Sequence, residues 1–371
     1  MRAFVLACAI VWAALGCARL SAASPSWNAQ AAAEYLDTRE AWWMAWPAAA
    51  RDHQTFCVSC HTAVPYALSR PLLRATLGEP RPADAERKLR DSVAWRVTHW
   101  AETEPYYRDQ DQQSRGTEAV LNALILACGD EVAGKLSAET REALRILWAL
   151  QQTSGGQRGA WPWINFSNEP WEAADSPYYG AALAAIAVGT APENYQADPA
   201  IRGVVALLRD YLAGKYPQQS AMNQAFLLWA SGKLRGLLTP DQQDGVRQEL
   251  LRAQRSDGGW STAALGWSWR ATSVSSLFKM WIRSDETPQA GSDGLATGLV
   301  VYALLQTGTS QRDARLSRGL DWLARNQDRK NGRWMARSLN ARRDPSSAPA
   351  NFMTDAATGF AVLALSSSKP D

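Results

Sequence analysis

Thr297-Gly-Leu-Val-Val-Tyr-Ala-Leu304 belongs to a set of similar segments that decide the fold. Close copies are His61-Thr-Ala-Val-Pro-Tyr-Ala-Leu68, Thr117-Glu-Ala-Val-Leu-Asn-Ala-Leu124 and Thr358-Gly-Phe-Ala-Val-Leu-Ala-Leu365. Looser copies begin at Gly180 and Asn223, so that six starts follow one another at intervals of roughly 45 to 60 residues. Small and apolar residues throughout these segments predict buried helices whose backbones approach closely.

Longer amphipathic segments with charged faces alternate with these six copies. They span residues 28–37, 83–100, 138–151, 199–213, 241–254 and 312–326. A helix with one charged face suits an outer layer that contacts water on one side. The pattern therefore predicts an all-α (α/α)6 toroid of six helical hairpins, with the apolar helices inside. We expect residues 24–371 to form this single domain, with its helices between about Trp27 and Ser368.

The turns after three of the outer segments share glutamine, glycine and tryptophan. They are Gln151 with Gly159-Ala160-Trp161, Gln254 with Gly258-Gly259-Trp260, and Gln327 with Gly332-Arg333-Trp334. Glutamine can hydrogen-bond a loose helix end, glycine permits the reversal, and tryptophan can wedge between hairpins. These turns resemble the QW repeats of terpene cyclases. Most of residues 26–368 is similar to the C-terminal toroid of the squalene and hopene cyclase family, a resemblance that implies the fold but no reaction.

Cyclase chemistry is not expected in spite of this resemblance. Squalene-hopene cyclases carry a D-x-D-D general acid just before an inner helix, and no such cluster precedes Thr117, Thr297 or Thr358. Asp109 and Asp111 lie several residues too early, which favours a solvated turn. Zinc prenyltransferases, the other relatives, need late Asp, Cys and His ligands. No Cys or His follows residue 128 in this chain.

The N-terminus is typical of an export signal. Arg2 precedes an apolar run, and Ser21-Ala-Ala23 suits a cleavage site, so residues 1–23 are predicted to be a signal peptide and the protein to be exported, most simply to the periplasm. Ala14-Leu-Gly-Cys17 partly resembles a lipoprotein box, which leaves anchoring through Cys17 as a minor alternative. No later stretch approaches the ~20 apolar residues that a transmembrane helix needs.

Composition excludes other classes of protein. Of 371 residues, 46% are hydrophobic and 20% are charged, which is typical of a globular protein with a large core. The formal net charge is only +3 and no dense Lys/Arg cluster occurs, so a nucleic-acid partner is not expected. After the predicted signal only Cys57, Cys60 and Cys128 remain, too few for a disulfide framework.

Cys57-Val-Ser-Cys-His61 stands at the start of the first predicted inner helix. This is the spacing of covalent c-type haem attachment, in which two thioethers hold one porphyrin edge and the histidine ligates iron. Export supports the interpretation, because bacterial c-type haem is attached outside the cytoplasm. We therefore expect haem c on Cys57 and Cys60, with His61 as the proximal ligand.

Other interpretations of the motif stay open. A C-x-x-C pair at a helix N-terminus also suits a disulfide or redox pair, although no βαβ pattern accompanies it. Zinc would need a further ligand from His53, His99 or Cys128.

The sixth ligand of a bound iron can be narrowed to a few candidates. Met353 lies in the turn before the sixth inner helix, which adjoins the first when the ring closes, and is our first candidate. His99 is the second, and an open or water-bound position is a further alternative. Packing alone is also a common role for methionine.

Polar and aromatic residues precede other inner segments and are expected to meet at the same mouth of the ring. They are Arg115, Glu118, Asp175, Tyr178, Tyr179, Asp293 and Asp355. Each alone is commonly a helix cap or a solvated residue, whereas together they would suit a polar substrate or a periplasmic redox partner. We expect electron transfer or haem-dependent oxidation. The alternative is a haem-independent toroid that binds or processes an isoprenoid or a glycan.

Overall fold

The computed structural model describes residues 26–266, 291–340, 343–344 and 347–368. These residues form an all-α protein. In this part of the chain the only β pairing consists of isolated bridges, at Ala50–Phe56, Asn168–Glu172 and Asp328–Arg333. The predicted signal peptide, including Cys17, lies outside the described residues.

Six of the helices are largely buried and correspond to the six repeated segments. They are α2 (Ala63–Leu77), α4 (Asp111–Glu131), α6 (Ser176–Thr190), α8 (Ala221–Lys233), α12 (Gly294–Gln306) and α14 (Phe352–Ser367). Every residue from Tyr178 to Val188 in α6, and from Met353 to Leu365 in α14, is buried. Small residues make this possible: a Cβ added to Gly359 of α14 would lie only 2.5 Å from the Cβ of Pro65 in α2.

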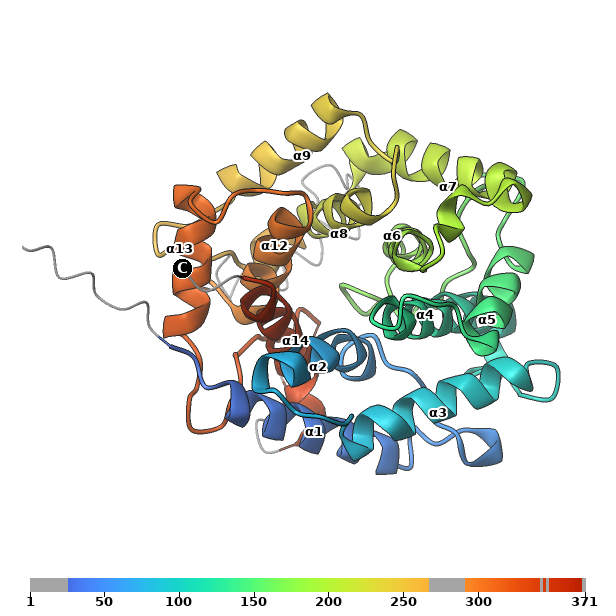
Figure 1. Ribbon diagram of the computed structural model, residues 1–371, viewed down its shortest axis with the longest axis horizontal. Helices are drawn as coiled ribbons and strands as arrows, with labels where there is room; N and C mark the ends of the chain where they lie inside the picture. The colour runs from blue at the N-terminus through green and yellow to red at the C-terminus, as the bar shows by residue number, and fades with distance from the viewer. Residues whose placement is uncertain (1–25, 267–290, 341–342, 345–346, 369–371) are drawn as a thin grey trace, which may run out of the picture.

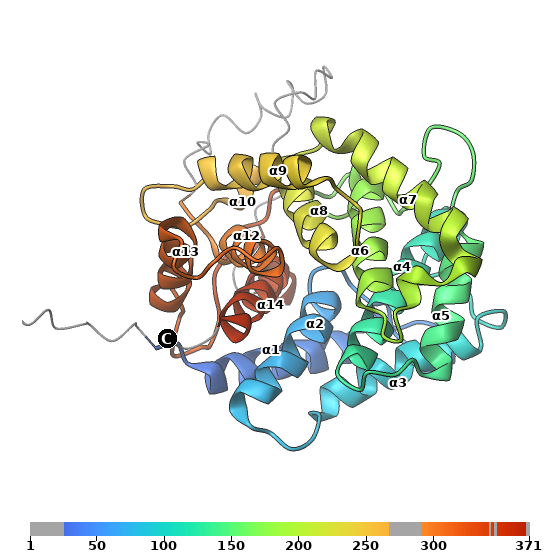
Figure 2. The same cartoon turned by 45° about the horizontal axis from the view of Figure 1, so that its top comes forward.

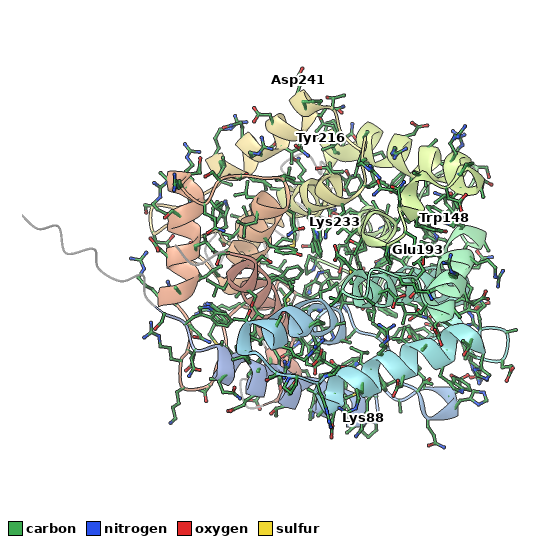
Figure 3. All side chains as sticks on the ribbon, in the orientation of Figure 1. Lys88, Trp148, Glu193, Tyr216, Lys233 and Asp241 are labelled. Carbon is green, nitrogen blue, oxygen red and sulfur yellow. The ribbon has the colours of Figure 1, made fainter. Side chains whose placement is uncertain are left out.

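Six amphipathic helices correspond to the predicted outer segments. They are α1 (Ala29–Ala45), α3 (Asp84–Thr98), α5 (Ala138–Ala149), α7 (Arg202–Lys215), α9 (Pro240–Arg252) and α13 (Ala314–Arg325). Each buries an apolar stripe, such as Val246, Leu250 and Leu251 of α9. Charged side chains cover the opposite faces; Lys88 of α3 and Asp241 of α9 are exposed at the periphery (Figure 3). A short helix, α10 (Thr262–Leu265), follows α9.

The buried helices contact one another in chain order. Helix α2 contacts α4, and the series continues through α6, α8 and α12 to α14, which returns to contact α2. Figure 1 shows the amphipathic helices around this group, and the tilted view in Figure 2 keeps the same order. The first and last buried helices are therefore neighbours, which places the start of α2 beside the start of α14.

The three Gln–Gly–Trp turns repeat one hydrogen-bond pattern. In the first, the Gln151 side chain donates to the carbonyls of Gly159 at 3.0 Å and Val204 at 3.1 Å, and the Trp161 indole donates to Leu147 O at 2.7 Å. Gln254 and Gln327 make the equivalent pairs of bonds. Each amide thus joins its own turn to the beginning of an adjacent outer helix.

The third of these turns joins the segment after α13 to the start of α1. The Gln327 side chain donates to Asn28 O at 3.0 Å and accepts from Asn28 N at 2.6 Å. Gly332 has a φ of 72° and packs directly on the Ala31 carbonyl, where no side chain would fit. The C-terminal outer hairpin is therefore attached to the N-cap of α1.

Among the described helices, none combines the length and the apolar character that a membrane span requires.

Candidate functional site

The Cys57–His61 turn leads directly into α2. The Cys57 N–H donates to Ala49 O at 2.8 Å. The Ser59 hydroxyl accepts the N–H groups of Thr62 at 3.2 Å and Ala63 at 3.0 Å, and so satisfies donors at the helix start. The Cys57–His61 turn and the beginning of α2 therefore form one continuous structure.

Both thiols of the motif are buried and free. Burial raises the pKa of Cys57 to about 12, and it raises the pKa of Cys60 well above the usual value. The charge of Glu172 raises both pKa values further, whereas the hydroxyls of Tyr107 and Tyr179 oppose the shifts at Cys57 and Cys60, respectively. The two sulfurs are thus protonated at neutral pH, unlike the thiolate of a reactive cysteine.

Aromatic side chains enclose the His61 ring. Phe352, the first residue of α14, stacks on it with ring centroids 3.8 Å apart, and Trp43 of α1 meets it edge-on at 5.0 Å. The Trp43 indole also donates to Cys57 O at 2.7 Å, so the same tryptophan contacts both the His61 ring and the backbone of the cysteine turn. Burial, followed by the charges of Arg39 and Arg343, lowers the pKa of His61 to about 3. The ring is therefore neutral at pH 7, as a metal ligand must be.

A chain of hydrogen bonds runs from the His61 ring into the protein. His61 Nδ1 lies 2.8 Å from Thr62 Oγ1, and the Thr62 hydroxyl donates to Asp355 Oδ2 at 2.8 Å. Asp355 also accepts from Arg39 Nε and Nη2, at 2.8 and 2.9 Å, and from the Tyr35 hydroxyl at 2.7 Å. For His61 Nε2 no hydrogen-bond partner occurs among the residues that the structure describes.

Of the seven residues predicted at the mouth, Asp355, Tyr179 and Glu118 interact with the motif. Asp355 and Tyr179 do so through Thr62 and Cys60, and Glu118 acts on Cys57 through its charge. Glu118 itself forms a fully buried ion pair with Arg96, at 2.5 Å. Burial raises the pKa of Glu118, and Arg96 opposes that shift.

The other four predicted residues have partners elsewhere. The Arg115 guanidinium lies over the Trp100 ring at 4.6 Å, and the Asp175 carboxylate accepts a hydrogen bond from Asn223 at 3.2 Å. The Tyr178 hydroxyl donates to Leu212 O at 3.0 Å, and the Asp293 carboxylate accepts from Thr262 and from the N–H of Ala296 in α12. Asp293 is thus the N-cap of its helix.

The candidates for a further iron ligand lie in two places. Met353 is buried in the first turn of α14, directly after Phe352. His99 stacks on the Trp95 ring with centroids 4.3 Å apart, and His53, considered above as a zinc ligand, lies 4.9 Å from the same ring. Across the described ranges, no three His, Cys, Asp or Glu side chains are grouped as a metal site.

A cleft of about 540 Å³ lies beside the motif. Its lining includes Arg51 and Tyr107, and both residues act on the Cys57 thiol, Arg51 through its charge and Tyr107 through its hydroxyl. The Arg51 guanidinium stacks over the Tyr107 ring at 5.0 Å.

Sequence reasoning did not identify Thr62, Arg39, Tyr35 or Trp43 as parts of the site. Thr62 directly follows the motif, and Trp43 belongs to the aromatic-rich run from Trp42 to Trp46, so both carried a usable signal. Arg39 and Tyr35 had no sequence feature that pointed to the site, because charged and aromatic residues are ordinary on an amphipathic helix.

No family model and no curated protein matches this chain. The function is therefore inferred from the site itself.

Proposed function

We propose that this chain is an exported c-type haem protein, with haem c attached to Cys57 and Cys60 and with His61 as the proximal ligand. The state of His61 is the observation that carries the proposal. Its Nδ1 is hydrogen-bonded to Thr62 at 2.8 Å, while Nε2 has no partner among the described residues. A histidine that binds a metal through one ring nitrogen usually hydrogen-bonds through the other.

The donor set fits this cofactor. Two thiols three residues apart lie in one buried turn, and a neutral imidazole follows the second. Trp43 and Phe352 supply an apolar aromatic enclosure, which suits a porphyrin. Thioether formation leaves no thiol to ionise, so the high pKa values of Cys57 and Cys60 do not oppose it, whereas they disfavour a reactive dithiol. When bound, the haem would supply one-electron redox chemistry at its iron.

We further propose that the helices form an (α/α)6 toroid like that of the squalene and hopene cyclase family. The contacts of α2 with both α4 and α14 support this arrangement. So do the bonds of Gln327 with Asn28, which join the last outer hairpin to the first.

The role that we favour is electron transfer to or from a periplasmic partner, or oxidation of a small polar molecule at the mouth. The cleft beside Cys57 supports both, because it would give a partner or a substrate access to the cofactor edge. Its lining carries charges of both signs, with Arg51 and Arg108 beside Asp52, Glu104 and Asp109, so a polar rather than an apolar partner or substrate suits it.

The proposal is tested by co-expressing the chain with bacterial haem-attachment machinery. Intact mass and a pyridine haemochrome spectrum are then measured for the wild type, Cys57→Ser/Cys60→Ser and Cys128→Ser. Cys128 lies in α4, so its variant is the matched control. We expect one covalent haem in the wild type and in Cys128→Ser, and none in the double variant. An unmodified wild-type mass, with attachment to a known c-type cytochrome in the same cells, would refute the proposal.

A further inference from the structure

We infer that Asp355 is a positioning residue for His61. Acting through the Thr62 hydroxyl, its carboxylate selects the ring form that carries hydrogen on Nδ1 and makes Nε2 the stronger electron donor. The part of this inference that concerns iron rests on the proposed haem function, whereas the part that concerns the ring form does not.

The first step is the direction of the hydrogen bonds at Asp355. The Tyr35 hydroxyl and Arg39 Nε donate to Oδ1, and Arg39 Nη2 donates to Oδ2, with distances of 2.7, 2.8 and 2.9 Å. A bidentate contact from a guanidinium favours the ionised over the protonated form of a carboxyl group, and an ionised carboxylate only accepts hydrogen bonds. The remaining neighbour on Oδ2, the Thr62 hydroxyl at 2.8 Å, must therefore donate.

The second step follows from the chemistry of a hydroxyl group. Thr62 has one hydroxyl hydrogen, and Asp355 receives it. In the 2.8 Å contact between Thr62 Oγ1 and His61 Nδ1, the oxygen can only accept. His61 therefore carries its hydrogen on Nδ1, and the lone pair of the neutral ring lies on Nε2.

The third step is the effect on a ligand bound at Nε2. A carboxylate that holds the distal N–H of a metal-bound histidine fixes the ring and raises its basicity. Here the hydroxyl of Thr62 transmits that effect. A more basic imidazole stabilises the oxidised, more positive iron, so the relay should lower the reduction potential.

A purely structural role for Asp355 must be separated from this one. Its ion pair with Arg39 joins α14 to α1 across 316 positions of the sequence, so replacing Asp355 would leave a buried arginine without its partner and destabilise the fold. Thr62→Val is the better test, because it removes the hydroxyl that connects Asp355 to His61 and keeps the Arg39–Asp355 ion pair. Thr62→Ser should restore it. Tyr35→Phe is the matched control, since it removes a different hydroxyl from the same carboxylate.

The first measurement uses the haem-free chain and ¹⁵N NMR of the ring nitrogens, with His61→Gln to assign the His61 signals. We expect the Nδ1–H form in the wild type, in Thr62→Ser and in Tyr35→Phe. We expect a mixture of ring forms in Thr62→Val, with a similar unfolding temperature. An unchanged ring form in folded Thr62→Val would overturn the inference, whether or not haem is ever attached.

The second measurement uses the haem-loaded protein. The midpoint potential of Thr62→Val should rise above that of the wild type, while Thr62→Ser and Tyr35→Phe should stay close to it. Equal potentials in the wild type and Thr62→Val would contradict the effect on iron and leave the haem assignment intact. Failure of haem attachment would instead contradict the proposed function, and the NMR result would still decide the positioning role.

Discussion

At the residue scale, His61 replaces a threonine that the other close copies of its repeat use for structure. Thr117, Thr297 and Thr358 each accept a backbone N–H from the turn that packs on the buried helix, at 3.1, 2.9 and 3.2 Å. His61 makes no such bond; its Nδ1 contacts Thr62 instead. In place of this structural threonine the first repeat thus carries an imidazole whose Nε2 has no hydrogen-bond partner within the described part of the chain.

The sequence predicts part of this site, and the reason for the gap is physical. Cys57, Cys60 and His61 are adjacent in the chain, so their spacing alone identifies them. Asp355 is expected near the mouth only because it precedes a repeat. The Arg39–Asp355 contact spans 316 positions of the sequence, and the link to His61 depends on the direction in which the Thr62 hydroxyl donates. Local sequence patterns contain no information about either.

Glu40 is a fully buried acid, and among the residues that the structure describes neither of its carboxylate oxygens has a hydrogen-bond partner. Burial, followed by the charge of Asp355, raises its pKa to about 8. The folded chain therefore binds a proton between about pH 4.5 and 8 that the unfolded chain releases. The stability associated with this proton is fully present below about pH 4.5 and is lost as the pH rises through 8.

We expect Glu40→Gln to remove this loss, since an amide does not ionise. Relative to the wild type, the variant should gain on the order of 4 kcal/mol at pH 8.5 compared with pH 5. Urea unfolding at both pH values measures the difference. Glu34→Gln, on an exposed face of the same helix, is the control and should show no comparable change. A gain that is the same at both pH values would contradict the shifted pKa of Glu40.

Met353 is our first candidate for the sixth iron ligand, because α14 adjoins α2 and Met353 follows the residue that stacks on His61. The oxidised haem-loaded protein should show the weak near-infrared band of sulfur bound to iron. Met353→Ala should abolish that band and, by truncating a buried side chain, cost about 2–5 kcal/mol. A band that persists in the variant, or is absent from the wild type, would favour His99 or an open position.

At the scale of the elements, the sequence repeats predict where the helices lie better than they predict where each helix begins and ends. The repeat at Thr117 predicts a buried helix there, and α4 begins six positions earlier, at Asp111. The outer segment expected at residues 28–37 extends as α1 to Ala45, because Leu36, Arg39 and Trp43 continue its buried stripe. The repeated pattern covers the apolar centre that the six buried helices share. The ends of the helices depend on capping contacts from turns that do not repeat.

The tryptophans of the Gln–Gly–Trp turns should dominate the stability of these elements. Trp260 is fully buried and its indole donates to Leu250 O at 2.7 Å. Trp260→Phe should cost about 2–4 kcal/mol, because it leaves a cavity and removes the indole donor from Leu250 O, which keeps only the N–H of Ala253. Trp148, labelled in Figure 3, is half-buried and donates to the Tyr195 hydroxyl at 2.9 Å. Trp148→Phe should cost less than about 1 kcal/mol in the same urea unfolding experiment; equal losses would contradict this ranking.

At the scale of the whole molecule, two separate contacts join the first helix to the C-terminal part of the described residues. Gln327 bonds the N-cap of α1, and Asp355 of α14 pairs with Arg39 in the middle of that helix. The order of inner and outer helices follows from periodicity, but ring closure does not, because an open array has the same alternation. Closure of the proposed toroid is therefore tested separately from the order of its helices.

Comparing Gln327 with Gln254 provides that test. Both amides donate to two backbone carbonyls, but Gln254 joins consecutive hairpins, whereas Gln327 joins the last hairpin to the first. If closure is part of one cooperative fold, Gln327→Ala and Gln254→Ala should each cost about 1–3 kcal/mol with an unchanged urea m-value. If the first hairpin docks independently, Gln327→Ala should leave the main transition unchanged, and proteolysis should release residues near α1 before the rest unfolds. That result would contradict the closed ring while leaving the Gln254→Ala loss intact.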